Sequence, residues 1–160
     1  MKLNAFTDVS LRVLLTLGRD PERKLTSQEI ADRVGVPYNH VVKAVAELRR
    51  RGLLDVARGR AGGARITEAG LDQRVGGLVR DLSTRPEVVD CEGLESGAPC
   101  PIRDACGLRG ALARAREAFF AELDHHTVRE LVRVPDAGLA LLGMPTMPPA
   151  GAHAAPDALV

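Results

Sequence analysis

Residues 26–52 have the sequence TSQEIADRVGVPYNHVVKAVAELRRRG, which predicts two short helices joined by a tight turn. The first helix opens with a capping box, because Thr26 and Glu29 can satisfy each other's free backbone amides. Gly35 can adopt the positive φ that a tight turn requires, and Pro37 suits the first turn of the helix that follows. Residues 26–52 therefore predict a helix-turn-helix unit.

Apolar residues at helical spacing define the helices that surround this turn. An additional helix is predicted from Phe6 to Arg19, because the following Asp20-Pro21 ends the pattern. Its apolar positions are Phe6, Val9, Val13, Leu14 and Leu17. The helix after Pro37 is expected to point four residues toward a core, namely Val41, Val42, Val45 and Leu48.

Two short strands are predicted after the helix-turn-helix unit, at residues 53–57 and 64–66. The sequence between them, RGRAGG at residues 58–63, is typical of a hairpin turn. A helix-turn-helix followed by a basic hairpin is a winged helix-turn-helix. The predicted fold class is therefore mainly α with a small β-wing.

More helices are predicted toward the C-terminus. Residues 75–82 have a helical pattern, and Thr127 with Glu130 repeats the capping box at the start of a short final helix. Between them, a long helix carries a narrow apolar stripe suited to a contact between two helices. That stripe consists of Leu108, Leu112, Ala115, Phe119 and Leu123. The alternative is that the stripe packs on the winged domain of its own chain.

Composition divides the chain into four segments. Residues 1–85 form the winged helix-turn-helix domain, and residues 86–107 form a loop that contains every cysteine. Residues 108–134 hold the long dimerisation helix and the short final helix. Residues 135–160 are rich in Pro, Ala and Gly, which predicts a flexible tail.

The net charge of +1 conceals an asymmetry between the two halves of the chain. Residues 1–80 hold 15 Lys and Arg against 9 Asp and Glu, and residues 81–160 hold 7 against 12. The first half is therefore suited to a polyanion and the second is not. Aromatic residues are 2% of the chain, which disfavours a stacking surface for single-stranded nucleic acid. The N-terminus lacks the basic start and apolar run of a signal peptide, so a cytoplasmic location is expected.

The second helix of the unit and the hairpin carry side chains suited to double-stranded DNA. Asn can bridge adenine, His and Lys can donate to guanine or phosphate, and Arg on a wing can reach the backbone or the minor groove. The candidate DNA-binding residues are Tyr38, Asn39, His40 and Lys43 on the second helix, Arg58, Arg60 and Arg65 on the hairpin, and also Ser27 and Gln28 at the start of the first helix. The alternative is a merely solvated surface, but the coincidence of helix-turn-helix and basic wing favours DNA.

The three cysteines, Cys91, Cys100 and Cys106, fall within 16 residues, separated by gaps of 8 and 5 residues. Such a cluster favours metal or redox chemistry over structural disulfides. Three thiolates can hold an iron–sulfur cluster or zinc, and His125 or His126 could complete a zinc site. The spacing lacks the Cys-x2-Cys knuckle of zinc ribbons, and thiols without any ligand are a further alternative.

These motifs together resemble the NsrR family of nitric-oxide-sensitive repressors, which are relatives of the iron–sulfur regulator IscR. The resemblance covers roughly residues 1–134. The residues that carry it are Phe6-Thr7-Asp8 leading into Leu11-Arg12, the run 36–43, the wing from Gly59 to Gly63, and the loop from Cys91 through Cys106 into residues 108–112. The first cysteine gap is longer than is usual in the family. Ligation should survive, because added loop length costs little entropy.

The resemblance implies a homodimer with one 4Fe–4S cluster per subunit, bound by Cys91, Cys100 and Cys106. It also implies that the partner subunit's Asp8 is the fourth ligand, although the sequence by itself pairs Asp8 with Arg12 at i+4. A protein of this kind is a transcriptional repressor of a pseudo-palindromic operator, and it releases the DNA when nitric oxide reacts with the cluster.

Two alternatives stay open. One is a regulator of the same fold that senses iron or redox state, and the other is a zinc-stapled interaction module. An enzyme or electron carrier is disfavoured, because no catalytic carboxylate pair, nucleophile–base pair or nucleotide-binding loop accompanies the cysteines. We also expect no membrane span, because prolines interrupt the uncharged residues of the C-terminal segment.

Overall fold

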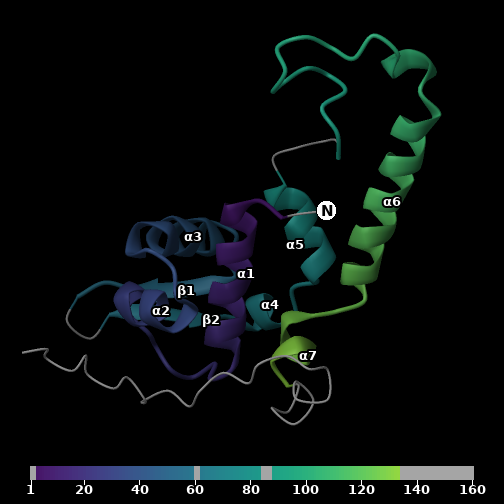
Figure 1. Ribbon diagram of the computed structural model, residues 1–160. Helices are drawn as coiled ribbons and strands as arrows, with labels where there is room; N and C mark the ends of the chain where they lie inside the picture. The colour runs from purple at the N-terminus through teal and green to yellow at the C-terminus, as the bar shows by residue number, and fades with distance from the viewer. Residues whose placement is uncertain (1–2, 60–61, 84–87, 134–160) are drawn as a thin grey trace, which may run out of the picture.

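The structure is a computed structural model and describes residues 3–59, 62–83 and 88–133. The elements are α1 (Ala5–Gly18), α2 (Ser27–Val34), α3 (Tyr38–Arg50), β1 (Leu54–Ala57), β2 (Gly63–Ile66), α4 (Glu68–Leu71), α5 (Val75–Leu82), a 3-10 turn η1 (Arg103–Ala105), α6 (Gly107–Asp124) and α7 (Val128–Val132). Helix α1 lies at the centre, between α2, α3 and the sheet on one side and α5 and α6 on the other (Figure 1). The fold is mainly helical with a small antiparallel wing, which confirms the predicted fold class.

The helix-turn-helix forms where the sequence predicts it. The Thr26 side chain accepts a hydrogen bond from the Glu29 amide (3.2 Å), and the Glu29 carboxylate accepts one from the Thr26 amide (2.8 Å). Gly35 ends α2 with a φ of 68°, a left-handed conformation that glycine adopts without strain. Pro37 directly precedes Tyr38, the first residue of α3. The turn and the two ends of α2 are therefore specified by residues that are close together in the sequence.

The wing is an antiparallel pair of strands in which Leu54 lies opposite Ile66. Each strand begins one residue away from its predicted start. Leu25 and Ala64 exchange backbone hydrogen bonds of 3.0 and 2.8 Å, which attach β2 to the segment before α2. The wing is thus held to the helix-turn-helix by backbone pairing as well as by its buried side chains.

The core of the winged unit gathers around α1, whose Val9, Val13, Leu14 and Leu17 are buried as predicted. From α3, Val41 and Leu48 are fully buried, but Val42 is 38% exposed, so its predicted inward orientation is wrong. The reason is helical geometry, because successive residues are about 100° apart around a helix. When residues 41, 45 and 48 face α1, residue 42 faces outward.

Two short elements, α4 and the 3-10 turn η1, were not predicted from the sequence. Helix α4 has four residues, and the Thr67 side chain caps it by accepting a hydrogen bond from the Gly70 amide (3.0 Å). Its Leu71 is buried. A single helical turn presents too few apolar positions for periodicity to detect. The predicted helix at residues 75–82 and the second capping box, between Thr127 and Glu130, are both confirmed.

Helices α5 and α6 approach closely at Gly76. A Cβ at this position would collide with the Phe120 carbonyl oxygen and the Asp124 carboxylate of α6. The guanidinium groups of Arg80 and Arg116 lie 4.9 and 4.7 Å from the centroid of the Phe120 ring, one from each helix. Arg80 also pairs with Asp124 (3.2 Å). This joint attaches the C-terminal half of α6 to the winged domain.

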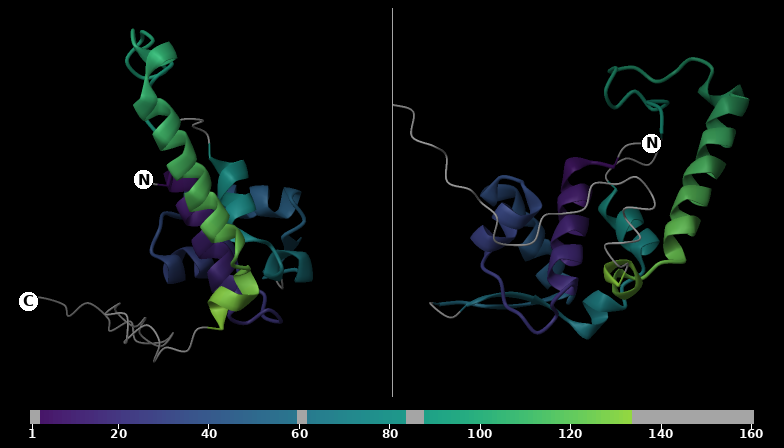
Figure 2. Two further views of the ribbon diagram at one scale, coloured as in Figure 1. Left: turned by 90° about the vertical axis from the view of Figure 1, so that its right-hand side faces the viewer. Right: turned by 60° about the horizontal axis from the view of Figure 1, so that its bottom comes forward.

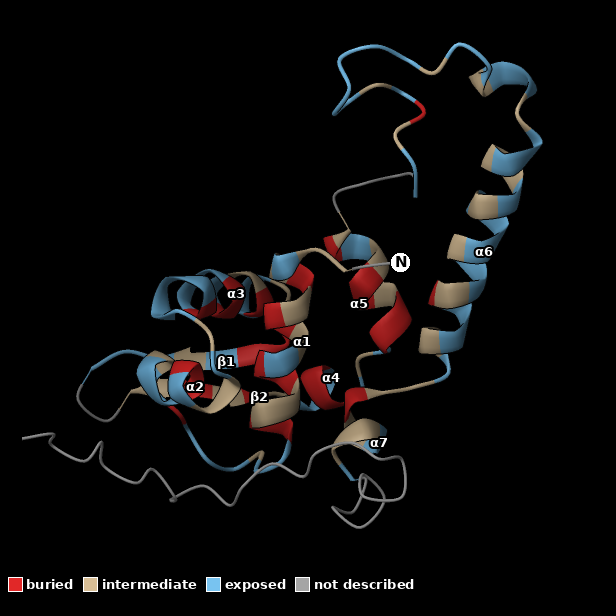
Figure 3. Ribbon diagram, in the orientation of Figure 1, coloured by how far each residue is buried: buried red, intermediate tan, exposed pale blue. Residues whose placement is uncertain are grey.

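The N-terminal half of α6 extends past α5 toward the cysteine loop, as two views show (Figure 1, Figure 2). Colouring by burial shows α6 mostly exposed or intermediate (Figure 3), and Phe120 is its buried residue. Within the predicted stripe, Phe119 and Leu123 pack partly on the core, whereas Leu108 is 62% exposed. The stripe therefore divides, and its first half does not pack on the core of its own chain.

Some predictions fall outside the described residues. These concern Arg60 in the wing, the boundary at residues 85 and 86, and the tail at residues 135–160. Among the helices that the structure describes, none combines the length and apolar character needed to span a membrane.

Substituting Gly76→Ala should destabilise the protein by about 1–3 kcal/mol, because the added methyl group overpacks the joint between α5 and α6. Gly77→Ala is the matched control, since its Cβ would meet nothing closer than 3.9 Å. The control should stabilise α5 by about 0.5–1 kcal/mol. Urea unfolding followed by circular dichroism measures both. Equal effects of the two substitutions would contradict the close approach at Gly76.

Candidate nucleic-acid interface and cysteine loop

The outer surface of α3 carries most of the side chains predicted to bind DNA. Tyr38, Asn39, His40 and Lys43 are all exposed. They lie in the first two turns of the helix, where a major-groove helix contacts base edges. The structure therefore brings these four candidate residues onto one surface.

The candidates on α2 are arranged differently. Ser27 is the first residue of α2 and is half-buried. Gln28 is exposed, and its amide donates a hydrogen bond to Asp32 (2.9 Å). Amides at a helix N-terminus bind phosphate well, so these two residues suit the backbone of DNA better than its bases.

On the wing, Arg58 is exposed at the end of β1 and is available to a polyanion. Arg65 pairs with Asp55, its neighbour across the sheet, at 3.2 Å. A phosphate would have to compete with this carboxylate for Arg65. Exposed pairs of this kind contribute little free energy, so the competition is feasible.

The cysteine loop folds back on itself between its first two cysteines. The Cys100 amide donates a hydrogen bond to the Cys91 carbonyl oxygen (3.0 Å). The Asp90 carboxylate, directly before Cys91, accepts hydrogen bonds from three amides between the two cysteines, those of Leu94, Glu95 and Ser96 (2.7–3.0 Å). These bonds, led by that from Ser96, lower the pKa of Asp90. The long first gap is therefore a closed turn that returns the chain to Cys91.

The third cysteine lies where the loop meets α6. Cys106 is the N-cap residue of α6. The Glu92 carboxylate binds Arg103 and Arg109, each at 2.8 Å, and so connects the first part of the loop to both sides of Cys106. The two ion pairs of Glu92 therefore connect the first part of the loop to its end and to the start of α6.

A cavity of about 200 Å³ lies between the loop and α6. It is lined by Val88, Val89, Cys91, Arg109, Leu112, Ala113 and Arg116. Cys91 is buried, whereas Cys100 and Cys106 are intermediate, and none of the three forms a disulfide. The buried Cys91 thus shares the lining of this cavity with Arg109 and Arg116.

The three cysteines fit an iron–sulfur cluster by donor type and by their place in one loop. In the part of the chain that is described, no three or more His, Cys, Asp or Glu side chains are arranged as a metal site. Asp8 forms the ion pair with Arg12 that the sequence indicates (3.0 Å). His126, which the sequence offered as a zinc ligand, has its Nε2 4.0 Å from the Glu122 carboxylate.

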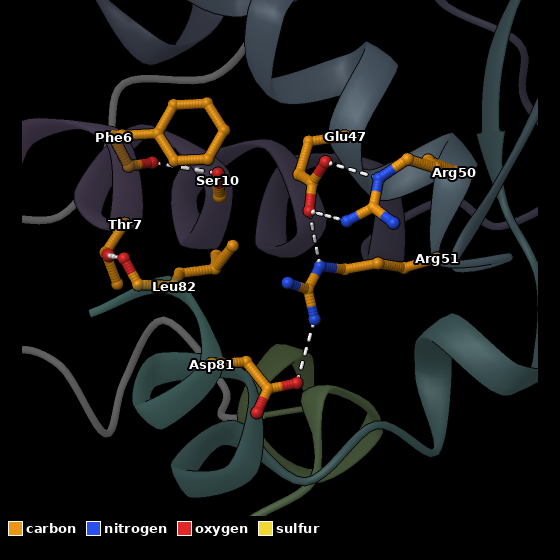
Figure 4. A network of polar contacts seen from close by, with 8 residues as sticks. All are labelled: Phe6, Thr7, Ser10, Glu47, Arg50, Arg51, Asp81 and Leu82. Carbon is orange, nitrogen blue, oxygen red and sulfur yellow. Dashed lines mark hydrogen bonds and ion pairs between the residues drawn. The ribbon is translucent and has the colours of Figure 1, made fainter. Parts of the chain in front are cut away.

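The last turn of α5 contacts both α1 and α3 (Figure 4). The Leu82 carbonyl oxygen accepts hydrogen bonds from Thr7 (3.2 Å) and Asn4 (3.0 Å) of the α1 segment. Its neighbour Asp81 pairs with Arg51 (2.8 Å) at the C-cap of α3. The same short segment thus holds the start of one helix and the end of another.

The contact with α3 continues as a small network of charges. Arg51 also binds Glu47 (2.8 Å), and Arg50 binds the same carboxylate through two hydrogen bonds. These bonds, led by those from Arg50, lower the pKa of Glu47 to about 2. Sequence reasoning missed this network. The i,i+3 and i,i+4 spacing could have indicated the pairs within α3, but nothing local indicates the contact with Asp81.

Comparison with known proteins adds a family and relatives. The model of the Rrf2 family, "Iron-dependent Transcriptional regulator", matches residues 3–134. The HTH-type transcriptional repressor NsrR of Streptomyces coelicolor is 47% identical over 150 residues, which are 92% of this chain and 99% of that protein. The HTH-type transcriptional regulator NsrR of Shouchella clausii is 36% identical over 147 residues, which are 91% and 98% of the two chains.

The fold also matches a solved structure, that of IscR from T. potens. The two have a TM-score of 0.63 and are 20% identical, and the match covers 88% of this chain and 90% of that one. At this identity the similarity concerns the fold, which agrees with the winged helix-turn-helix described above.

The low pKa of Glu47 predicts a pH-dependent effect of Glu47→Gln on stability. A carboxylate whose folded pKa is depressed stabilises the fold above its unfolded pKa, and this contribution is lost as the pH falls through the folded value. At pH 7 the variant should melt about 2–4 °C lower. The difference should shrink as the pH falls from 4.5 to about 2.

Thermal unfolding at pH 7, 4 and 3 measures this effect. Glu22→Gln, at an exposed residue between α1 and α2, is the control and should leave the melting temperature unchanged. A difference for Glu47→Gln that is constant with pH would refute the charge network around Glu47.

Proposed function

The chain belongs to the Rrf2 family of transcriptional regulators, and we propose that it is a DNA-binding repressor that senses nitric oxide through a 4Fe–4S cluster. Its relatives are regulators of transcription and not enzymes. One observation carries the proposal. The three-cysteine loop follows α5, and the last turn of α5 is bonded to α3, the helix with the candidate base-contacting residues.

DNA binding is assigned to α3, the start of α2 and the wing. Asn39, His40 and Lys43 lie on the exposed surface of α3, and Tyr38 lies at its N-terminal end. In the major groove, Asn suits adenine, and His and Lys suit guanine or phosphate. The exposed Arg58 extends the same cationic surface onto the wing.

A homodimer is supported by the unpacked first half of α6. Leu108 is 62% exposed and Ala115 is exposed, although both belong to the apolar stripe. Two copies of this half-helix can cover each other's apolar residues, as in a two-helix coiled coil. The two-fold axis would place two α3 helices on successive major grooves of a pseudo-palindromic operator.

Cys91, Cys100 and Cys106 would hold the cluster, and the partner subunit's Asp8 would be its fourth ligand. The exposure of Asp8 suits this role, but its carboxylate must first leave Arg12. When bound, the cluster supplies iron that reacts with nitric oxide. The three thiolates of this chain would hold the loop closed, and Glu92 binds Arg103 and Arg109, which precede and follow Cys106 in the chain.

The protein part of the signal runs from the loop into α5. Three thiolates held together would restrict residues 91–106, and we infer that this restriction reaches the end of α5, which precedes the loop in the chain. Asp81 and Leu82 transmit that restriction to Arg51 of α3 and Thr7 of α1. When the thiolates are released, the end of α5 gains freedom and α3 loses its fixed position. Coupling of this kind requires two states with different DNA affinity.

A second function is a regulator of the same fold that responds to iron or to redox state. The family model is described as iron-dependent, which favours this reading. It uses the same three cysteines, so only the reactivity of the protein distinguishes the two functions.

The test is to purify the full chain without oxygen and to measure iron, sulfide, zinc and DNA affinity. About four iron and four sulfide per chain are expected, and DNA affinity should fall as nitric oxide is added. Cys91→Ala, Cys100→Ala and Cys106→Ala should each abolish both the visible absorption of the cluster and specific DNA binding. Ser96→Ala, within the same loop, is the control and should retain both.

Zinc without sulfide, or DNA binding that nitric oxide does not change, would contradict the proposal. Loss of DNA binding on mild iron chelation, with nitric oxide inactive, would establish the iron-responsive function instead.

Asp81→Asn should weaken the coupling between the cysteine loop and α3 while the cluster still forms. An exposed ion pair contributes up to about 1 kcal/mol, so the ratio of DNA affinities with and without cluster should fall by up to about fivefold. Asp72→Asn is a matched control. Asp72 is exposed to a similar extent (65% against 62%) and also binds an arginine at 2.8 Å, but it connects α4 to α7.

Fluorescence anisotropy with labelled DNA measures the affinities of the cluster-loaded and cluster-free forms. If Asp72→Asn and Asp81→Asn lower the ratio equally, or if neither does, the path through the end of α5 is wrong.

A further inference from the structure

Exposed hydrophobic side chains are unevenly distributed over the molecule. In the described part of the winged unit, residues 3–59 and 62–83, the large ones are Tyr38 (48% exposed) and Val42 (38%). Both lie on α3, one helical turn apart. The remaining ones fall between residues 88 and 108, in the cysteine loop and at the start of α6. In the described part of the winged unit, exposed large apolar side chains therefore occur on α3, and Val42 is the aliphatic one.

Packing within the chain does not account for Val42. Its neighbours Val41 and Val45 are buried against the core, whereas Val42 is turned about 100° from Val41 around the helix and is 38% exposed. A β-branched residue at an exposed helical position also lowers helix propensity slightly. Neither the core nor the helix is stabilised by valine here, which points to a contact outside the chain.

The surroundings of Val42 show which kind of contact fits. Asn39, Val42, Lys43 and Ala46 are exposed at the spacing i, i+3, i+4 and i+7, which is one continuous stripe of the helix. The polar Asn39 precedes Val42 by one turn, and the small Ala46 follows it by one turn. The stripe thus places the apolar Val42 between the polar Asn39 and the small Ala46, with the charged Lys43 beside it.

In the major groove of DNA, the thymine 5-methyl group is the apolar group that a side chain can contact. We propose that Val42 contacts the 5-methyl group of a thymine in each operator half-site, and so determines part of the sequence specificity. The proposal rests on the proposed function, and it adds the base and the residue that recognises it. Asn39, one turn away, suits a neighbouring adenine–thymine pair through its bidentate hydrogen bonds to adenine.

The test starts from a DNA sequence enriched from a random pool by the cluster-loaded, full-length protein. Each thymine of that sequence is then replaced in turn by uracil, which lacks only the 5-methyl group. The wild-type protein should lose about fourfold in affinity at one thymine per half-site, the effect of removing one buried methyl group. Val42→Ala should bind the thymine and uracil versions equally well.

Two further variants separate this contact from a general loss of binding. Val42→Thr keeps one methyl group and should retain part of the preference for thymine. Lys43→Ala should lower the affinity for both versions by the same factor, because a charge contact does not involve the methyl group. Cluster content and the melting temperature of each variant show that the fold is intact.

The outcomes are distinct. If wild-type protein binds every uracil-substituted site as well as the original, or if Val42→Ala keeps the full preference for thymine, the assignment of Val42 is overturned. If the random pool enriches no sequence at all, the proposed function fails as a sequence-specific repressor, and the assignment of Val42 fails with it.

Discussion

The carbonyl oxygen of Leu82 and the carboxylate of Asp81 bind two different helices from one turn of α5. Thr7 and Asn4 of the α1 segment donate to the first, and Arg51 of α3 pairs with the second. Because the buried Thr7 hydroxyl satisfies a carbonyl at a helix end, the cost of burying both groups is offset. The chain then continues toward Cys91. In the proposed regulation, a restriction of the cysteine loop would therefore act on a segment that already holds both α1 and α3.

The second organising contact is the close approach of α5 and α6. Gly76 removes the side chain that would separate them, and Phe120 lies between the cations of Arg80 and Arg116. Only the C-terminal half of α6 is fixed in this way. The other half carries exposed apolar residues, of which Leu108 is the clearest, up to the cysteine loop. Helix α6 thus packs on the core of its own chain at its C-terminal end and, as we propose, on a second copy of the chain at its N-terminal end.

Sequence periodicity and capping motifs predicted the helix-turn-helix, α5 and α7, because these elements are specified by residues within four positions of each other. Val42 was assigned to the core because a run of valines does not reveal which one faces inward. The apolar stripe of α6 divides in two, because only its C-terminal half packs against the core, near Phe120 and Gly76. That contact depends on a neighbouring helix, which the pattern within α6 does not reveal. The pairing of Asp81 with Arg51 joins residues 30 positions apart, and no local pattern encodes it. The cysteines were evident as candidates, whereas the closed turn between Cys91 and Cys100 depends on backbone bonds to Asp90.

The most direct measurement is hydrogen exchange of the backbone amides in cluster-loaded and cluster-free protein. If the cysteine loop acts on α3 through the end of α5, loss of the cluster should increase exchange in three places: residues 91–106, the last turn of α5, and the C-terminal turn of α3 around Arg51. The start of α7, which the route does not include, should be unchanged. Faster exchange confined to residues 91–106, with α3 and α5 unaltered, would contradict the coupling on which the proposed regulation rests.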